Sequence, residues 1–241
     1  MKVKSILLVL TGAVLIIVGT IKIKSGQPGL QQQEESRRGT LKWHAQQAKA
    51  KGEQQVVIPA PIERVAHVTN LDEALSRFHL TALIGEPVEE KSFAQGEDNI
   101  ATWYKFRVKE YLSQQSVSEC RTCSLPPDVP QEFLPLKDDE ILVLKAGGAL
   151  AVDGVKVINQ ERDFPEFSKS QEYLLLLDLN LSTKVGRLSI GPYGVFTIDS
   201  NGLLRSVNKK PHPLKQEMQI RYLDSVERLR ANLKERHEAP R

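Results

Sequence analysis

The chain has few of the residues and motifs that carry enzyme chemistry. Only two of its 241 residues are cysteine and five are histidine, and the histidines show no H-x-x-H or H-E-x-x-H spacing. The G-x-S-x-G motif of a serine nucleophile elbow is missing, and Gly147-Gly148 lacks the G-K-[ST] that contacts phosphate in a P-loop. These absences exclude the usual signatures of zinc proteases, serine hydrolases and P-loop proteins. We therefore expect no cofactor and favour a protein without enzymatic activity.

Basic charge is scarce outside the N-terminal segment. The formal net charge is +3, but Lys2, Lys4, Lys22 and Lys24 all precede Gln27. Subtracting those four lysines from the 33 basic residues leaves 29 basic and 30 acidic residues, which is a net charge of −1. A domain that binds nucleic acid normally carries a basic surplus. The sequence therefore argues against nucleic acid as a partner.

One long uncharged run lies near the N-terminus, from Ser5 to Ile21. As a helix its 17 residues span about 25 Å, just enough to cross a hydrocarbon core of about 30 Å with some thinning. A cleavable signal would have a shorter apolar core and a small-residue cleavage site, whereas lysines follow this run at once. We predict that residues 1–24 are a membrane anchor or signal segment, with the uncleaved anchor favoured. The bulk of the chain is then periplasmic or extracellular.

The remaining sequence divides into three predicted parts. Residues 25–58 are polar and Gln-rich, and they predict a juxtamembrane spacer or a frayed helix because they bury little apolar surface. Residues 59–212 predict a β-barrel-like domain, and residues 213–241 predict a C-terminal amphipathic helix. A short helix over 71–78, capped by Asn70, is expected near the start of the β domain.

Short apolar segments separated by Gly, Asp and Asn predict that this domain is mainly β. The predicted strands are Leu80–Val88, Ile100–Leu112, Ile141–Lys145, Leu150–Ile158, Tyr173–Leu179, Arg187–Ile190, Val195–Ile198 and Leu203–Val207. Asp153-Gly154 predicts a hairpin turn, and the continuous apolar run after Glu172 predicts a strand buried on both faces. The predicted fold is an antiparallel OB-like barrel or a small sandwich.

Apolar residues recur at helical spacing in the last segment. Met218, Tyr222, Val226, Leu229 and Leu233 form one stripe, which we call the C-terminal stripe. We favour packing of this stripe on the β domain. A coiled coil with a second copy is an alternative, although two heptads are short for one. Binding of a partner protein is the third interpretation.

The two cysteines, Cys120 and Cys123, lie in a loop between predicted strands. In an oxidising compartment the default is a disulfide between them, which closes a ring small enough to stabilise only its own loop. A thioredoxin-like redox pair would need a helix after the first cysteine, and Ser124-Leu125-Pro126-Pro127 does not continue one cleanly. A structural zinc site would need two further ligands.

Several packing motifs between about residues 78 and 207 follow a common order. They are Thr102, Tyr104, Phe106 and Val108, the pair Gly147-Gly148, the set Phe167, Tyr173, Leu174, Leu175 and Leu177, and finally Gly194, Val195, Phe196 and Ile198. The region resembles an uncharacterised bacterial extracytoplasmic module with an OB-like or netrin-like β-barrel. It departs from that pattern at Ser170, where a glycine is usual, and at Leu176, where an aromatic is usual. The resemblance implies a fold and an extracytoplasmic location, and it supplies no catalytic residues. Protease inhibition, suggested only by the netrin-like side of the resemblance, would need an N-terminal cysteine that this chain lacks.

Together these patterns predict a membrane-tethered extracytoplasmic module that binds or scaffolds other components. Its expected partners are the membrane, through the N-terminal span, and an envelope protein. The alternative is a thiol–disulfide or redox-sensing protein that uses Cys120 and Cys123. The sequence makes no prediction of oligomeric state.

Overall fold

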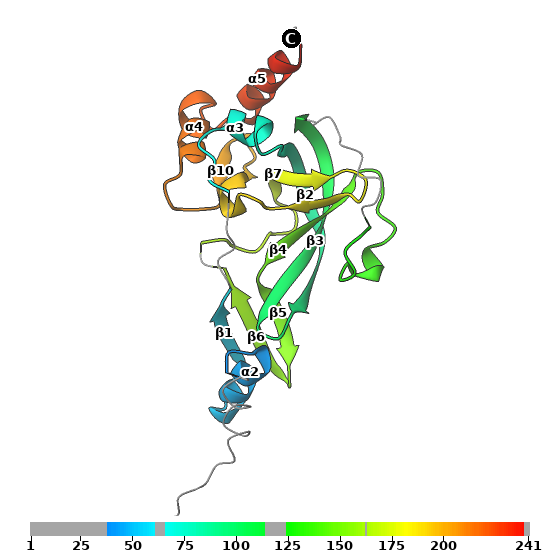
Figure 1. Ribbon diagram of the computed structural model, residues 1–241. Coiled ribbons are helices and arrows are strands. Elements are labelled where there is room, and N and C mark those ends of the chain that lie inside the picture. Colours follow the sequence, from blue (N-terminus) through cyan, green and yellow to red (C-terminus); the bar gives the residue numbers. More distant parts are fainter. Residues whose placement is uncertain (1–37, 61–65, 114–123, 162, 239–241) are drawn as a thin grey trace, which may run out of the picture. The chain divides into compact units, whose positions relative to one another are not determined.

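A computed structural model describes residues 38–60, 66–113, 124–161 and 163–238 (Figure 1). The predicted span Ser5–Ile21 and the cysteines Cys120 and Cys123 lie outside these residues. Within the described part of the chain, no helix is both long and apolar enough to cross a membrane.

The larger of two sheets has seven strands in the order β10-β9-β7-β2-β3-β4-β8, with an additional pairing between β7 and β8. The strands are β2 (Thr81–Gln95), β3 (Asn99–Ser113), β4 (Glu140–Ala146), β7 (Glu172–Asn180), β8 (Val185–Arg187), β9 (Val195–Ile198) and β10 (Leu204–Ser206). All of these pairings are antiparallel except that between β4 and β8. Because β7 pairs with both β2 and β8, strands β2, β3, β4, β8 and β7 form a closed ring of pairings. The prediction of a mainly β domain is confirmed.

Most strand positions agree with the predicted ones. Asp153 and Gly154 take left-handed backbone angles, φ 50° and 83°, in the turn between β5 (Gly148–Val152) and β6 (Val155–Gln160). The central part of β7 is buried on both faces, as its apolar run predicts. The predicted strand Arg187–Ile190 is wrong in position. The strand ends at Arg187, and the chain then turns through Gly191, at φ 54°, into the short helix η2 (Gly191–Gly194).

The smaller sheet, of order β1-β6-β5, corrects the prediction of a spacer over residues 25–58. Within that range, α2 (Leu41–Ala50) and most of β1 (Gln55–Pro59) are regular structure, and β1 pairs with β6 in parallel. Leu41, Ala45 and Ala48 of α2 are buried against Ile58 and Val157 of the sheet. Their i, i+4, i+7 spacing makes a narrow apolar stripe that the glutamine-rich composition conceals.

The two sheets meet where the β2–β3 hairpin passes the start of β5. Thr102 Oγ1 donates a hydrogen bond to the Gly147 carbonyl at 2.7 Å, and it lies 2.8 Å from Ser92 Oγ. Gly148 cannot be larger here, because a Cβ would lie 2.2 Å from Thr102 Oγ1. The double glycine therefore permits the start of β5 to lie close to Thr102 and Ser92 of the β2–β3 hairpin.

One side of the larger sheet buries an aromatic cluster. The Phe167 ring lies edge-on to the rings of Tyr104, Phe106 and Tyr173, with centroids 5.0–5.1 Å apart. The Tyr173 hydroxyl accepts a hydrogen bond from the Ser168 N–H at 2.8 Å. Such edge-to-face contacts are favourable for aromatic rings, so this cluster anchors the segment before β7 to β3.

The other side of the sheet is covered by α3 (Leu71–Ser76), α4 (Pro213–Arg221) and α5 (Val226–Glu238). Figure 1 shows these three helices at one end of the strands. The prediction of a single C-terminal helix is wrong, because Leu223 and Asp224, at φ 49° and 53°, reverse the chain between α4 and α5. All residues of the C-terminal stripe are nevertheless buried in the same apolar cluster as β2, β7 and β9. They are core residues, which leaves no exposed stripe for a coiled coil or a partner.

Candidate functional site

An open cleft of about 810 Å³ lies among β2, β3, the start of β7, the turn after β9, and α5. We call it the α5 cleft. Its lining residues are Ile84, Lys109, Glu110, Ser170, Gln171, Glu172, Ile198, Asp199, Ser200, Gly202, Val226, Glu227 and Arg230. The volume falls within the range of small-molecule sites, and most of the lining residues are polar.

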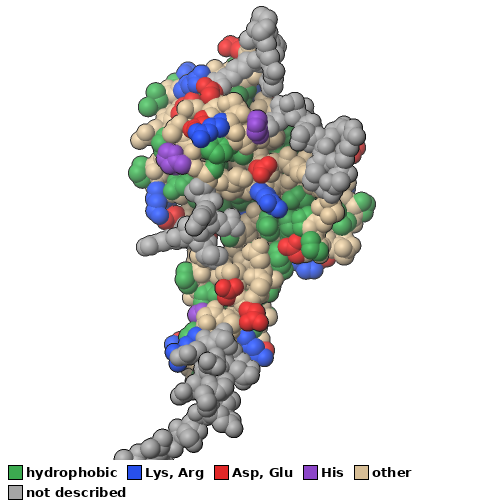
Figure 2. Space-filling model, viewed as in Figure 1, with side chains coloured by type: hydrophobic (Ala, Val, Ile, Leu, Met, Phe, Trp, Pro, Cys, Tyr) green, Lys and Arg blue, Asp and Glu red, His purple; other side chains and the backbone are tan. Residues whose placement is uncertain are grey.

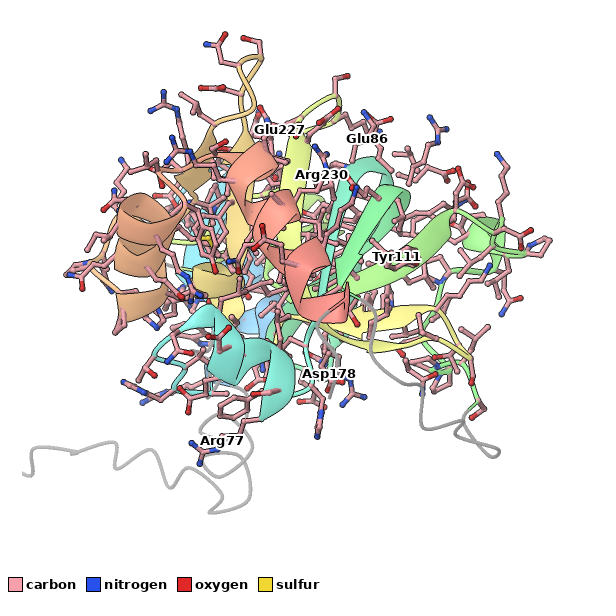
Figure 3. The ribbon with its side chains drawn as sticks, turned by 90° about the horizontal axis from the view of Figure 1, so that it is seen from above. Arg77, Glu86, Tyr111, Asp178, Glu227 and Arg230 are labelled. Atoms are coloured by element: carbon pink, nitrogen blue, oxygen red, sulfur yellow. The ribbon has the colours of Figure 1, made fainter. Side chains whose placement is uncertain are left out.

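Arg230 forms one wall of the cleft. Its Nε lies 2.8 Å from Glu110 Oε1 and its Nη2 lies 2.6 Å from Glu110 Oε2, while Nη1 contacts Glu227. Figure 3 shows Arg230 and Glu227 side by side on α5. The hydrogen bonds to Glu110 and Glu227 raise the pKa of Arg230. This paired contact holds α5 against β3.

Lys109 forms a second ion-paired wall. Its Nζ lies 2.6 Å from Glu172 Oε1 of β7 and 2.8 Å from Glu86 Oε2 of β2. Hydrogen bonds to Glu172 and then Glu86 raise the pKa of Lys109. One lysine on β3 thus contacts carboxylates on both β2 and β7, which pair with each other in the sheet.

The turn after β9 closes the third side. Asp199 Oδ1 accepts hydrogen bonds from the backbone N–H groups of Leu203 and Asn201, at 3.0 and 2.9 Å. The bond from Leu203 is the main reason that the pKa of Asp199 is lowered. Gln171 Nε2 donates to the Ile198 carbonyl at 2.8 Å. The backbone around the cleft is therefore well fixed.

The lining of the cleft carries more carboxylates than cations. Four carboxylates and two cations line the cleft, and no histidine or cysteine is among them. The hydroxyl groups of Ser170 and Ser200, both exposed, make no hydrogen bond to the described residues. Each of the four carboxylates already contacts a cation, Asp199 through Arg205 Nη2 at 3.4 Å, so a basic ligand would use their remaining lone pairs. No histidine of the lining is placed to activate the serine hydroxyls.

A second, smaller hollow of about 280 Å³ lies at the turn between β7 and β8. It is lined by Ser124, Pro126, Asp178, Asn180, Thr183, Val185 and Arg187. Ser124 directly follows the pair Cys120 and Cys123, both of which lie outside the described residues. The disulfide and the redox role of these cysteines therefore stay predictions.

Sequence reasoning missed the α5 cleft because its ion pairs join distant positions. Arg230 and Glu110 are 120 residues apart, and Lys109 and Glu172 are 63 apart. The only local signal is the charged pair Lys109-Glu110 at the end of a predicted strand. Across 38–60, 66–113, 124–161 and 163–238, no group of three or more His, Cys, Asp or Glu side chains could hold a metal ion.

The charged side chains on the face seen in Figure 2 are mixed rather than sorted by sign. On the face seen in Figure 2, basic and acidic side chains alternate, and no broad basic area covers that face.

Comparison with known proteins gives no match: no family model, curated protein or solved structure is significantly similar to this chain. The cleft must therefore be interpreted from its own geometry.

Proposed function

We propose that this protein is a non-enzymatic, membrane-tethered extracytoplasmic module that binds a polypeptide segment with basic side chains in the α5 cleft. The observation that carries the proposal is the cleft itself. It is open, its walls are held by ion pairs, and its carboxylates outnumber its cations. The tether is the run Ser5–Ile21.

The fold that we propose for the β domain is an OB-like barrel. The ring β2-β3-β4-β8-β7 supports this, since five strands in a Greek-key barrel define that fold. Fold alone does not determine function, so the ligand surface has to be argued from the side chains.

The outer face of β3 and β4 is covered by the chain itself. Trp103 on β3 and Leu142 on β4 pack under Val129 and Phe133 of the connection between these strands. OB-like barrels bind oligonucleotides and oligosaccharides on the corresponding side. Because the chain covers that side with its own residues, the α5 cleft is the better candidate for ligand binding.

A peptide titration tests this proposal on the full-length protein. Three sets of ten-residue peptides are used, carrying three Lys or Arg, three Asp or Glu, or no charge. We expect only the basic set to bind, with an affinity that falls as salt is added. Absence of binding by the basic set, or equal binding by all three sets, would refute the proposal.

A pair of variants locates the site. Ser200→Trp places an indole in the cleft from its exposed turn, and Ser182→Trp places one in the exposed turn between β7 and β8. Basic peptides should bind Ser182→Trp as they bind the wild type, and Ser200→Trp at least tenfold more weakly. Equal binding by both variants would move the site away from the cleft.

A double variant, Cys120→Ser with Cys123→Ser, distinguishes the binding module from the alternative redox role of the cysteines. A binding module retains its peptide affinity when both thiols are removed. Loss of binding in this variant, or a mixed disulfide trapped when only Cys123 is replaced, would favour the redox interpretation.

A further inference from the structure

The first turn of α4 is capped by a histidine. His212 has extended backbone angles, and its Nδ1 accepts a hydrogen bond from the Leu214 N–H at 3.2 Å. Its ring stacks on Tyr193 of η2, with centroids 4.1 Å apart and planes 16° from parallel. Ser, Thr, Asn and Asp are the usual residues at such a position. A ring nitrogen accepts a hydrogen bond only when it is unprotonated, so this cap requires neutral His212.

The surroundings of His212 offer little to stabilise a positive charge. Burial lowers the pKa of His212, and the nearby His67 lowers it further. The charged residues within three positions of His212 are all cations: Lys209, Lys210, which pairs with Asp163 at 2.8 Å, and Lys215. η2 contributes only the Tyr193 ring. Protonation would thus remove a cap and place a cation beside other cations.

α4 in turn holds α3 in place. Glu217 Oε2 accepts a hydrogen bond from the Leu71 N–H, the first residue of α3, at 2.6 Å. Arg221 lies 3.5 Å from Asp72 and 3.1 Å from Glu217. Leu214, one turn before Glu217, is fully buried in the core. A change at the start of α4 can therefore reach α3 through Glu217.

We propose that His212 is a pH-sensitive latch for α4. When neutral, it caps the helix and keeps Leu214 in the core and Glu217 on α3. When protonated, it releases the first turn of α4 and loosens the start of α3. The folded, latched state binds the proton less readily than the released state, so the latch is fully closed above the ordinary histidine pKa near 6.5 and weakens as the pH falls below it.

Amide hydrogen exchange on the full-length protein tests the latch. Exchange in α4 and α3 is measured at pH 7.5 and 5.5, and each rate is divided by the intrinsic rate for that pH. We expect protection of Leu214 and its neighbours to fall roughly fivefold at pH 5.5, the size of effect that loss of a cap produces. Strand β4 serves as the internal control and should keep its protection.

Two variants separate the latch from general acid sensitivity. His212→Asn supplies a cap that does not titrate, so α4 should stay protected at both pH values. His67→Gln removes a repulsive neighbour, so the latch should open at a higher pH than in the wild type. An imidazole titration by NMR gives the pKa of His212 directly in the wild type and in His67→Gln.

The proposal is overturned by either of two results. One is the same loss of protection in wild type and His212→Asn on going to pH 5.5. The other is a wild type whose α4 protection does not change while NMR shows that His212 has become protonated.

Discussion

Arg230 on α5 and Glu110 on β3 form a two-point contact, with Nε 2.8 Å from Oε1 and Nη2 2.6 Å from Oε2. Both side chains are about one quarter to one third exposed, so solvent only partly screens them. On the adjacent face of the same helix, Leu229 is fully buried. α5 is thus held by apolar packing through Leu229 and by a paired charge contact at the cleft.

The geometry of this contact predicts that lysine cannot replace Arg230. A lysine keeps the charge but cannot make two parallel hydrogen bonds to one carboxylate. We expect Arg230→Lys to lower the free energy of unfolding by about 1 kcal/mol in urea denaturation. Arg228, exposed on the same helix and without an ion pair to the described residues, is the matched control and should tolerate lysine. Equal effects of the two substitutions would contradict the role of the two-point contact.

Because the C-terminal stripe is buried, truncating one of its residues should lower stability far more than truncating an exposed apolar residue nearby. Leu229 is fully buried, whereas Ile220 on α4 is 79% exposed. Leu229→Ala should lower the free energy of unfolding by about 3 kcal/mol, since it leaves a cavity in the core. Ile220→Ala should change it by less than about 0.5 kcal/mol. If Leu229→Ala were equally harmless, the stripe would be a partner surface rather than core.

Replacing Gly85 or Gly154 by alanine should destabilise the protein, for a different physical reason in each case. A Cβ on Gly85 of β2 would lie 2.8 Å from the Arg107 carbonyl oxygen, so the two strands would have to move apart. Gly154 has open space around it but a φ of +83°. We expect Gly154→Ala to cost about 1 kcal/mol of backbone strain and Gly85→Ala to cost more. Thermal unfolding of both variants measures the difference, and a milder effect at Gly85 would show that the strands adjust easily.

Local patterns in the sequence were enough to predict most of the strands. The alternation around Phe106 and the apolar run from Tyr173 to Leu177 each identify a strand, because burial on one or both faces follows from side-chain period alone. The pairing order depends on contacts between distant segments. In particular, no local feature indicates that β4 and β8 run parallel.

The two errors in the helical regions have identifiable causes. In α2, the small side chains of Ala45 and Ala48 bury little area, so composition alone suggested a spacer. Between α4 and α5, the stripe continues in register through Tyr222 although the helix does not. The signal that was overlooked is Ser225, whose Oγ lies 3.4 Å from the Arg228 N–H as at a helix start.

The turn before β7 shows a further limit of pattern reasoning. Ser170 stands where the resembling module usually has glycine, and the chain still turns there with φ +66°. Phe167 and Tyr173 on either side pack together, at 5.0 Å between centroids, and fix the segment from both ends. Tertiary packing thus imposes a backbone conformation that the residue itself does not favour.

The carboxyl group of Glu73, at the start of α3, should titrate at an unusually low pH. Its Oε2 accepts hydrogen bonds from Thr69 N and Thr69 Oγ1, at 2.8 and 2.7 Å, and Oε1 lies 2.7 Å from Arg77 Nη1. These contacts, led by the Thr69 N–H, lower the pKa of Glu73 to about 2. The stabilisation is therefore complete above the ordinary glutamate pKa and is lost as the pH falls towards 2. In an NMR carboxyl titration, Thr69→Val should raise the pKa of Glu73 part of the way back, because the N–H remains while the hydroxyl is lost. Arg77→Gln should also raise it, because the contact of the guanidinium with Oε1 is lost. A wild-type midpoint near 4.5 would mean that the contacts with Thr69 are not formed in solution.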